Sequence, residues 1–520
     1  MAIPSPKIFL LLTFFFSHSI AVKSSNVSTT PTLHATFPFP EVSSFNSSKL
    51  SISININPNI INTLLQSLQA AISEATKLSD LLNNAGHNII ENKIGAVQDC
   101  RELQQSTLAS LKRSLSGIRS QDSRKLVDAR TYLSAALTNK DTCLESLDSA
   151  SGTLKPVLVN SVINSYKDVS DSLSMLPKPE RKASKGHKNR RLLWLSTKNR
   201  RLLQSNDGGE LVVAADGTGN FSTITEAINF APNNSVGRTV IYVKEGTYEE
   251  NVEIPSYKTN IVLLGDGKDV TFITGNRSVI DGWTTFRSAT LAVSGEGFLA
   301  RDIAFENKAG PEKHQAVALR VNADFTAFYR CAMYGYQDTL YVHSFRQFYR
   351  ECEIFGTIDY IFGNAAVVLQ ASNIITRMPM LGQFTVITAQ SRDSPDEDTG
   401  ISIQNCSILA TTDLYSNSGS VKSYLGRPWR VYSRTVFLES YIDQFIDPMG
   451  WKEWSGDQGL DTLYYGEYAN YGPGSGTDNR VNWAGFHVMD YDSAYNFTVS
   501  EFIIGDAWLG STSFPYDDGI

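Results

Sequence analysis

Metal-binding and redox-active residues are scarce in this chain, which has only five cysteines and seven histidines in 520 residues. No histidine cluster has the spacing of a metal site, and no Gly-x-Ser-x-Gly motif stands at a strand-to-helix turn. These absences argue against a metalloenzyme and against a serine hydrolase with a nucleophile elbow. The sequence therefore predicts no metal and no cofactor, and paired carboxylates remain as the candidate catalytic groups.

The apolar run near the start of the chain is too short to span a bilayer. It covers residues 8–16, follows Lys7 and precedes the small-residue site at 19–21. This pattern is typical of a cleaved secretory signal, so we predict a signal peptide over residues 1–21, secretion and no stable membrane insertion. Residues 22–58 are rich in Ser, Thr and Asn without a sustained period, which predicts a flexible leader. Candidate glycosylation sequons begin at Asn26, Asn46, Asn220, Asn233, Asn276, Asn405 and Asn496.

Helical spacing of apolar residues begins after the leader and continues to residue 177. Apolar side chains recur at i, i+3, i+4 and i+7 in four stretches, near residues 61–82, 103–118, 126–137 and 154–176. Four amphipathic helices in about 120 residues predict an up-and-down four-helix bundle over residues 59–177.

A basic segment follows at residues 178–204, with ten Lys or Arg against one acid and two copies of Arg-Arg-Leu-Leu, at 190–193 and 200–203. The simplest interpretation of this segment is a solvated linker. Residues 205–520 carry 39 acids and 21 bases, a net charge of −18, and the remainder has a net charge of +11. Opposite charges predict attraction between the two parts. The acidity of the larger part argues against nucleic acid as its ligand.

Short Val, Ile and Phe-rich runs alternate with Gly, Asn and Asp turns throughout residues 205–520, and no long helical stripe interrupts them beyond residues 223–230. Close strand spacing without helices favours a β-solenoid, a sandwich or a barrel. A constant interval between polar residues favours the solenoid among these three folds. Gln315, Gln337 and Asp359 follow one another at intervals of 22 residues, and Asp338 lies beside the second of them. Equivalent positions of a solenoid stack about 4.8 Å apart, so two amides and two carboxylates should meet.

Cysteine spacing agrees with the same period. Cys331 and Cys352 lie 21 residues apart, close to one turn. Stacking would bring their Cα atoms within the range of about 4.4–6.8 Å that a disulfide requires, so we predict that they pair. Cys406 is the odd cysteine, expected to be buried and inert.

Several spaced motifs together resemble one known family. The segments QAVALR (315–320), GYQDTLY (335–341), GTIDYIFGNA (356–365) and YLGRPW (424–429) occur in order, and the chain from about Ile60 onward resembles plant pectin methylesterases with an N-terminal inhibitor-like pro-region. The resemblance implies a right-handed parallel β-helix over residues 205–520. The segments AVQDCRELQ and YLSAALTNKDTCLE resemble the pectin methylesterase inhibitor family, which implies a disulfide between Cys100 and Cys143. Four arginines match the family's processing sites: Arg190, Arg191, Arg200 and Arg201.

The resemblance also implies residue roles. Asp359 would be the nucleophile that attacks the methyl ester, and Asp338 the general acid and then base. Gln315 and Gln337 would stabilise the oxyanion, and Arg427 would hold Asp359 ionised. The positions that match substrate contacts of the family are Thr285, Gln315, Arg427 and Trp429.

Two aromatic positions have alternative interpretations. Trp451 is either a further face for sugar rings or part of the core. Tyr360 stands where the family usually has Phe, an exchange expected to affect at most a subsite and to leave both carboxylates in place.

The implied partners are methyl-esterified homogalacturonan, the chain's own pro-domain, separate inhibitor proteins and a processing protease, for a monomeric enzyme of the cell wall. Two other functions stay open at this stage. A β-helix lyase or glycosidase acting on the same polymer should carry an acidic calcium cluster or another carboxylate pair, and neither is found in the sequence. A catalytically silent pectin-binding or inhibitory protein would not need Asp338, Asp359 and Arg427. The bundle itself is either an inhibitor or only an aid to folding and transport.

Overall fold

The computed structural model describes residues 58–84, 89–178 and 211–520. The predicted signal peptide, nearly all of the leader and most of the basic linker lie outside these residues, as do Arg190, Arg191, Arg200 and Arg201. Within the described ranges, we find no helix with the length and apolar character needed to cross a membrane.

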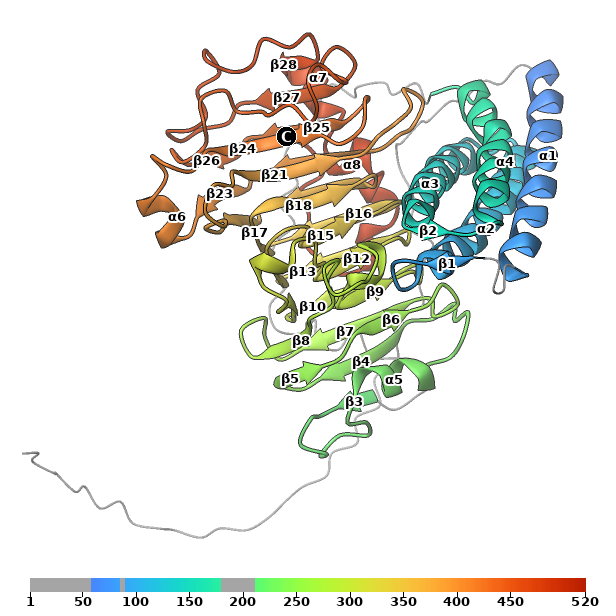
Figure 1. Ribbon diagram of the computed structural model, residues 1–520, viewed down its shortest axis with the longest axis horizontal. Coiled ribbons are helices and arrows are strands. Elements are labelled where there is room, and N and C mark those ends of the chain that lie inside the picture. Colours follow the sequence, from blue (N-terminus) through green and yellow to red (C-terminus); the bar gives the residue numbers. More distant parts are fainter. Residues whose placement is uncertain (1–57, 85–88, 179–210) are drawn as a thin grey trace, which may run out of the picture. The chain divides into compact units, whose positions relative to one another are not determined.

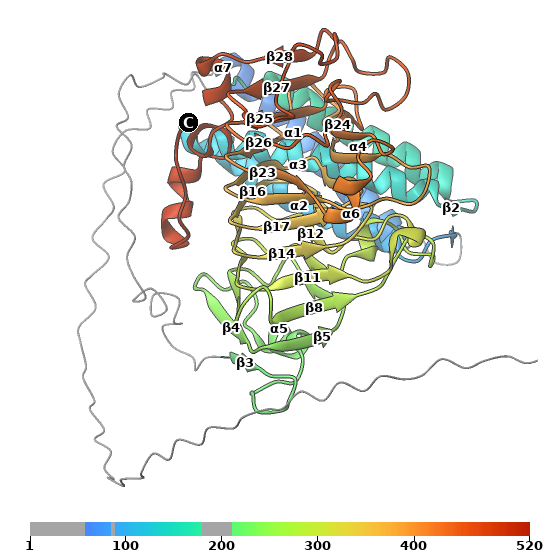
Figure 2. The ribbon, with the colours of Figure 1, turned by 90° about the vertical axis from the view of Figure 1, so that its left-hand side faces the viewer.

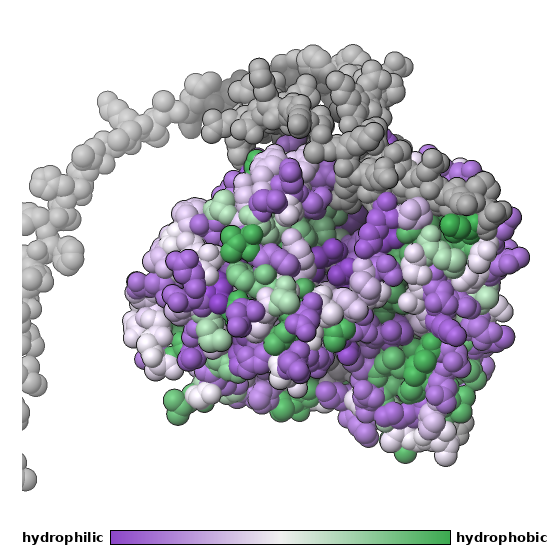
Figure 3. Space-filling view, turned by 90° about the horizontal axis from the view of Figure 1, so that it is seen from above, coloured by the Kyte–Doolittle hydropathy of each residue, from purple (hydrophilic) through white to green (hydrophobic). Residues whose placement is uncertain are grey.

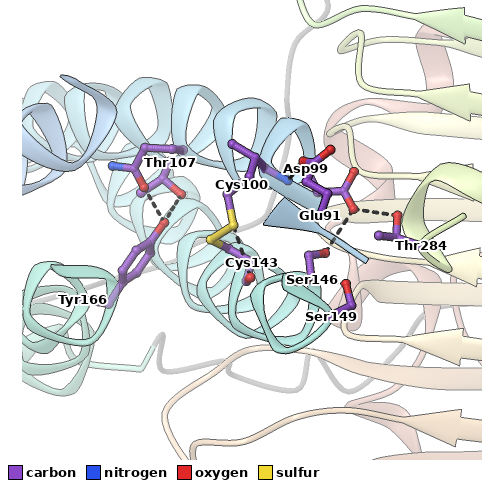
Figure 4. The surroundings of a disulfide bond; sticks show 11 residues. Glu91, Asp99, Cys100, Thr107, Cys143, Ser146, Ser149, Tyr166 and Thr284 are labelled. Carbon is purple, nitrogen blue, oxygen red and sulfur yellow. Dashed lines mark hydrogen bonds between the residues drawn. A yellow bond between two sulfur atoms is a disulfide. The ribbon is translucent and has the colours of Figure 1, made fainter. Parts of the chain in front are cut away.

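The predicted helices form a bundle. Its members are α1 (Pro58–Asn83), α2 (Ala96–Ser120), α3 (Ser123–Asp148) and α4 (Lys155–Met175), and a two-stranded pair, β1 (Ile90–Glu91) and β2 (Ala150–Ser151), lies beside them. The carboxylate of Asp122 accepts hydrogen bonds from the backbone N–H groups of Arg124 and Lys125 and so caps the start of α3. The predicted disulfide between Cys100 and Cys143 joins α2 to α3 (Figure 4).

Parallel strands build residues 211–520, which we call the β-domain. Three sheets run along it, with strands stacked in chain order (Figure 1), and this confirms the predicted parallel β-helix. The eleven-stranded sheet contains β3 (Leu211–Val213), β4 (Thr239–Val243), β7 (Ile261–Gly265), β10 (Leu299–Arg301), β13 (Thr326–Tyr329), β16 (Arg346–Arg350), β19 (Ala366–Gln370), β22 (Gly400–Gln404), β25 (Arg434–Leu438), β27 (Tyr464–Tyr468) and β28 (Phe486–Val488).

The other two sheets complete each turn of the helix. The eight-stranded sheet contains β5 (Gly246–Glu249), β8 (Thr271–Gly275), β11 (Ala304–Asn307), β14 (Ala332–Tyr334), β17 (Glu353–Gly356), β20 (Asn373–Thr376), β23 (Ser407–Ala410) and β26 (Tyr441–Ile442), most of them visible one above another in Figure 2. The seven-stranded sheet contains β6 (Val252–Ile254), β9 (Leu291–Val293), β12 (Leu319–Val321), β15 (Leu340–Val342), β18 (Ile358–Gly363), β21 (Thr385–Gln390) and β24 (Ser423–Pro428).

The length of a turn varies along the β-domain. Leu319 of β12 pairs with Leu340 of β15, which pairs with Ile361 of β18, so these turns advance by 21 residues. Val262 of β7 pairs instead with Leu299 of β10, 37 residues later. The predicted spacing near 22 is therefore local to the middle turns, because the loops that join the strands differ in length.

The predicted disulfide between Cys331 and Cys352 is not formed, since both are buried free thiols, as is Cys406. Neighbouring residues pair in register, so the two cysteines do stack on successive turns. Equivalent residues of parallel strands, however, have nearly parallel Cα–Cβ bonds, which keeps their sulfur atoms about one strand spacing, ~4.8 Å, apart. The spacing predicted the stacking and not the side-chain directions that a disulfide requires.

Short helices occupy the loops and the end of the β-domain. The predicted helix at residues 223–230 is α5 (Ile224–Phe230), which starts with a capping box between Thr223 and Glu226. The helices α6 (Thr412–Ser416), α7 (Tyr491–Tyr495) and α8 (Val499–Phe502) are too short to give a sequence period. Val499 of α8 packs with Phe348 and Val368 on the outside of the eleven-stranded sheet. Hydrophobic residues on the surface shown in Figure 3 are scattered among hydrophilic ones.

Candidate active site

A cavity of about 350 Å³ lies over the seven-stranded sheet. Every catalytic or substrate-binding residue predicted from the sequence lines it: Thr285, Gln315, Gln337, Asp338, Asp359, Arg427 and Trp429. These side chains come from five of six successive turns or the loops beside them, which explains why they are spread over more than 140 positions of the sequence.

Asp338 and Asp359 occupy equivalent places on successive turns. They are 21 residues apart, the same interval as the paired residues of β15 and β18. Both backbones are in the left-handed region, with φ of 64° and 52°, which Asp tolerates better than most residues. The register of β18 against β21 also shifts between Ile358 and Ile361, at the position of Asp359. Such an irregularity turns a side chain away from the regular alternation of a strand.

Arg427 makes a two-pronged contact with Asp359. Its Nε donates to Oδ1 at 2.8 Å and its Nη2 donates to Oδ2 at 2.5 Å. Burial raises the pKa of Asp359, while the hydrogen bonds and charge of Arg427 lower it. Asp338 has no such guanidinium partner among the described residues, and burial together with the charge of Asp359 raises its pKa well above the ordinary value. The pKa of Asp359 is therefore raised, and that of Asp338 is raised well above its ordinary value, so Asp359 is the more readily ionised of the two carboxyl groups.

Aromatic rings form a continuous line through the cavity that the sequence did not predict in full. Phe286 is followed by Tyr341, Phe362, Trp429 and Trp454, and consecutive ring centroids are 4.2–6.4 Å apart. The strand register explains part of this line, because Tyr341 of β15 pairs directly with Phe362 of β18. The spacing of these two residues in the sequence could have indicated that their rings stack. Trp454 lies in a loop and had no comparable signal.

The two aromatic residues left open by the sequence belong to the core. Trp451 is completely buried, stacks on Tyr465 and donates from its indole N–H to Glu467. Tyr360 is also completely buried, and its hydroxyl contacts that of Thr376 at 2.8 Å. Neither of them lines the cavity.

Helix α3 of the bundle forms part of the cavity wall. Its residues Thr142, Glu145 and Ser146 line the same cavity as the two aspartates. The hydroxyl of Thr142 contacts Nε2 of His343 at 2.9 Å, and Glu145 accepts a hydrogen bond from Arg430 at 2.5 Å. Arg130 of α3 makes a further contact with the β-domain. Its side chain is buried, and its Nε donates to the partly exposed carboxylate of Asp398 at 2.6 Å.

Comparison with known proteins agrees with this geometry. Residues 210–506 match the pectinesterase family, and residues 42–175 match the plant invertase/pectin methylesterase inhibitor family. The chain belongs to the pectinesterase family. It is 64% identical to probable pectinesterase/pectinesterase inhibitor 12 of Arabidopsis thaliana, over 98% of each chain, and 47% identical to pectinesterase 2 of Citrus sinensis, over 87% of this chain and 88% of that one.

A solved structure supports the same assignment for the β-domain of this pectinesterase. The pectin methylesterase from carrot aligns in full with 61% of the chain, at 53% identity and a TM-score of 0.60. The aligned share is about the size of the β-domain. This protein is therefore a pectin methylesterase that carries an inhibitor-like helical domain ahead of its catalytic β-helix.

Proposed function

We propose that Asp359 is the nucleophile of this pectin methylesterase and that Asp338 is its general acid and base. The observation that carries the proposal is the pair of buried aspartates on successive turns, of which only Asp359 is held by Arg427. A carboxylate kept ionised can attack, and a carboxyl group kept protonated can donate.

The reaction proceeds in two balanced steps. An oxygen of the Asp359 carboxylate forms a bond to the ester carbonyl carbon, and the carbonyl electrons move to oxygen beside the amide groups of Gln315 and Gln337. Collapse of this intermediate breaks the bond to the methoxy oxygen, which takes the proton of Asp338 and leaves as methanol. Asp338 is then ionised and removes a proton from water, whose oxygen attacks the acyl group. The bond between the acyl carbon and the Asp359 oxygen then breaks, so Asp359 leaves as a carboxylate, galacturonic acid is released, and Asp338 again carries a proton.

The line of aromatic rings offers flat apolar surfaces on which sugar rings of a methyl-esterified homogalacturonan can stack. Thr285 and Trp429, at the wall of the cavity, act as substrate contacts in this proposal. Their place beside the aromatic line, and on the same cavity as the two aspartates, is what supports the assignment.

The helical bundle inhibits the enzyme until it is removed. Support comes from α3, whose Thr142, Glu145 and Ser146 line the same cavity as the two aspartates and so occupy space beside them. Cleavage after Arg190–Arg191 or Arg200–Arg201 by a processing protease releases a monomeric mature enzyme that begins near residue 205. That enzyme acts outside the cell, in the wall, where separate inhibitor proteins compete for the same face.

A methanol-release assay tests the proposal. The β-domain, expressed as residues 205–520, should release methanol from esterified pectin, and the full-length chain should release much less. The Asp359→Asn variant should lose nearly all turnover, because an amide cannot form the acyl intermediate. Substantial turnover by folded Asp359→Asn, with native circular dichroism, would remove Asp359 as the nucleophile.

A further inference from the structure

Two buried arginines lie beside the cavity and have no role in the reaction described above. Arg287 is in the short helix Phe286–Ser288, Arg320 is in β12, and their side chains are only 4% and 2% exposed. The guanidinium carbon of Arg320 lies 3.5 Å from the ring centroid of Phe286, which lines the cavity. The β-domain carries 37 acids and 21 bases, a net charge of −16, so a pair of neighbouring buried cations in it is unexpected.

The bundle supplies the anions that these arginines bind. The Glu102 carboxylate of α2 accepts from Nη2 of Arg287 at 2.5 Å, from the hydroxyl of Ser294 at 2.8 Å and from Nη1 of Arg320 at 3.5 Å. One turn earlier in α2, Asp99 accepts from Nε of Arg287 at 2.7 Å. It also accepts from the hydroxyl of Thr284 at 2.7 Å, as Figure 4 shows. All of these donors belong to the β-domain. Glu102 thus shows which groups of the β-domain can hold a carboxylate.

Without the bundle, the arginine pair keeps too few acceptors. Arg287 retains Glu253 at 3.3 Å, whose side chain is half exposed, and Arg320 retains the side-chain oxygen of Asn322. Nε of Arg320 is buried and has no hydrogen-bond partner among the described residues, even with the bundle in place. With Glu102 and Asp99 gone, two guanidinium groups face one partly exposed carboxylate, so the site favours an incoming anion.

Strand register places the pair on the path of an extended polymer. Arg320 pairs with Tyr341, Tyr341 with Phe362, Phe362 with Ala389 and Ala389 with Arg427. These residues form one row across five adjacent strands, so Arg320 lies about four strand spacings, ~19 Å, from Arg427 at the reaction centre. A linear polysaccharide that crosses the aromatic line reaches both ends of the row.

We propose that Arg287, Arg320 and Ser294 form a distal subsite that binds an unesterified carboxylate of the polygalacturonate chain, several sugar units from the ester that is hydrolysed. This inference rests on the proposed function, since it assumes that the polymer lies along the row. The enzyme then prefers chains that already carry free carboxylates, and its own product improves binding of the next stretch of polymer. Glu102 and Asp99 of the bundle occupy the same subsite, so the pro-domain excludes the polymer partly by presenting carboxylates in its place.

Binding to the isolated β-domain tests this subsite without relying on turnover. The carrot structure, which matches the β-domain alone over its full length, indicates that this part folds without the bundle. Isothermal titration should compare an unesterified oligogalacturonate with its fully methyl-esterified form at one salt concentration. We expect Arg320→Gln and Arg287→Gln each to weaken binding of the acid form roughly tenfold, the loss of one charge-assisted contact, and to change binding of the ester far less.

Arg330→Gln is the matched control, because Arg330 is 48% exposed and pairs with Asp302 away from the cavity. It should bind both oligomers like wild type. Equal affinity of Arg320→Gln, Arg287→Gln and wild type for the acid form would overturn the subsite. The same result together with weaker inhibition by the bundle would show that the arginines serve only to dock α2. A β-domain that binds the acid form through these arginines but releases no methanol would contradict the proposed function and leave the subsite intact.

Discussion

At the scale of single residues, the two aspartates share a chemistry and differ in their neighbours. Asp338 is 7% exposed and Asp359 is 5% exposed, so burial raises the pKa of each carboxyl group. Only Asp359 receives two hydrogen bonds from a guanidinium group. In the proposed mechanism, this arginine distinguishes the aspartate that attacks from the one that donates a proton.

The pH dependence of the reaction should follow from this arrangement. Arg427 lowers the pKa of Asp359, so Arg427→Gln leaves burial unopposed and raises that pKa further. We expect the acid limb of the kcat/KM profile to move to higher pH and kcat to fall, because less Asp359 is ionised at any given pH. Methanol release from the isolated β-domain across pH measures this. An acid limb that stays in place while kcat falls would mean that Arg427 contacts the substrate without tuning Asp359.

Gln337 belongs to the same scale. It lines the cavity next to Asp338, and the proposed mechanism assigns its amide N–H to the oxyanion. Gln337→Ala should lower kcat by about 10²–10³ with little change in KM, as for the loss of one oxyanion donor. Steady-state kinetics separates the two parameters. A raised KM with an unchanged kcat would assign Gln337 to ground-state binding of the substrate.

At the scale of elements, the helices α2 and α3 meet the β-domain through buried carboxylates. Burial raises the pKa of Asp99 to about 6 and that of Glu145 to about 7, against the opposing charges of Arg287 and Arg430. A carboxyl group whose pKa is raised by docking favours the docked state when it is protonated. The contribution of Asp99 and Glu145 to attachment is therefore strongest below the ordinary carboxyl range and weakens as the pH rises through about 6 to 7. Glu102 contributes with the opposite sign, because its burial is outweighed by the charges of Arg320 and Arg287, which lower its pKa, so its contribution is lost only as the pH falls through that lowered pKa.

Release of the bundle should consequently depend on pH. After cleavage of the linker with a site-specific protease, we expect the bundle to dissociate faster at pH 7.5 than at pH 5, and methanol release to rise in parallel. Glu145→Gln should reduce this difference, because the amide does not titrate. Lys77→Gln, at an exposed pair with Glu74 on α1, is the control and should behave like wild type. A dissociation rate independent of pH would contradict this role of the carboxylates.

At the scale of the whole molecule, the charge division seen in the sequence has a different meaning in the structure. Residues 59–177 contain twelve acids and twelve bases, so the excess positive charge lies in the leader and the basic linker and not in the bundle. The bundle contacts the β-domain through pairs of both polarities, such as Arg130 with Asp398 and Glu145 with Arg430. Overall attraction between an acidic enzyme and a basic bundle is therefore not what holds the two parts together. Individual pairs of opposite charge at their contact do so instead.

Processing should decide activity at this scale. Replacing Arg190, Arg191, Arg200 and Arg201 by Ala should leave a full-length precursor with little methanol-releasing activity, because α3 continues to occupy space beside the two aspartates. Secreted mass and specific activity, compared with wild type, measure the effect. Since most docking contacts are partly buried, raising the salt concentration should restore only a small part of the activity. A full-length, fully active precursor would show that the bundle does not regulate the enzyme.

The sequence alone determined the element types, the order of the domains and the candidate residues. Helical and strand periods are local properties of the chain, and the motifs around Gln315, Asp338, Asp359 and Arg427 carry the resemblance to the family in their residues and order alone. The disulfide between Cys100 and Cys143 also followed from the resemblance.

Only the tertiary structure decided which side chains meet and in which direction they point. Register on successive turns aligned Phe362 with Tyr341 but kept Cys331 apart from Cys352, because parallel side chains stack without converging. The docking of α2 against Arg287 and Arg320 joins residues about 185–220 positions apart, and no local period records such a contact. These long-range pairings depend on loop lengths and side-chain directions. The periodicity of the sequence contains neither, so it could not predict them.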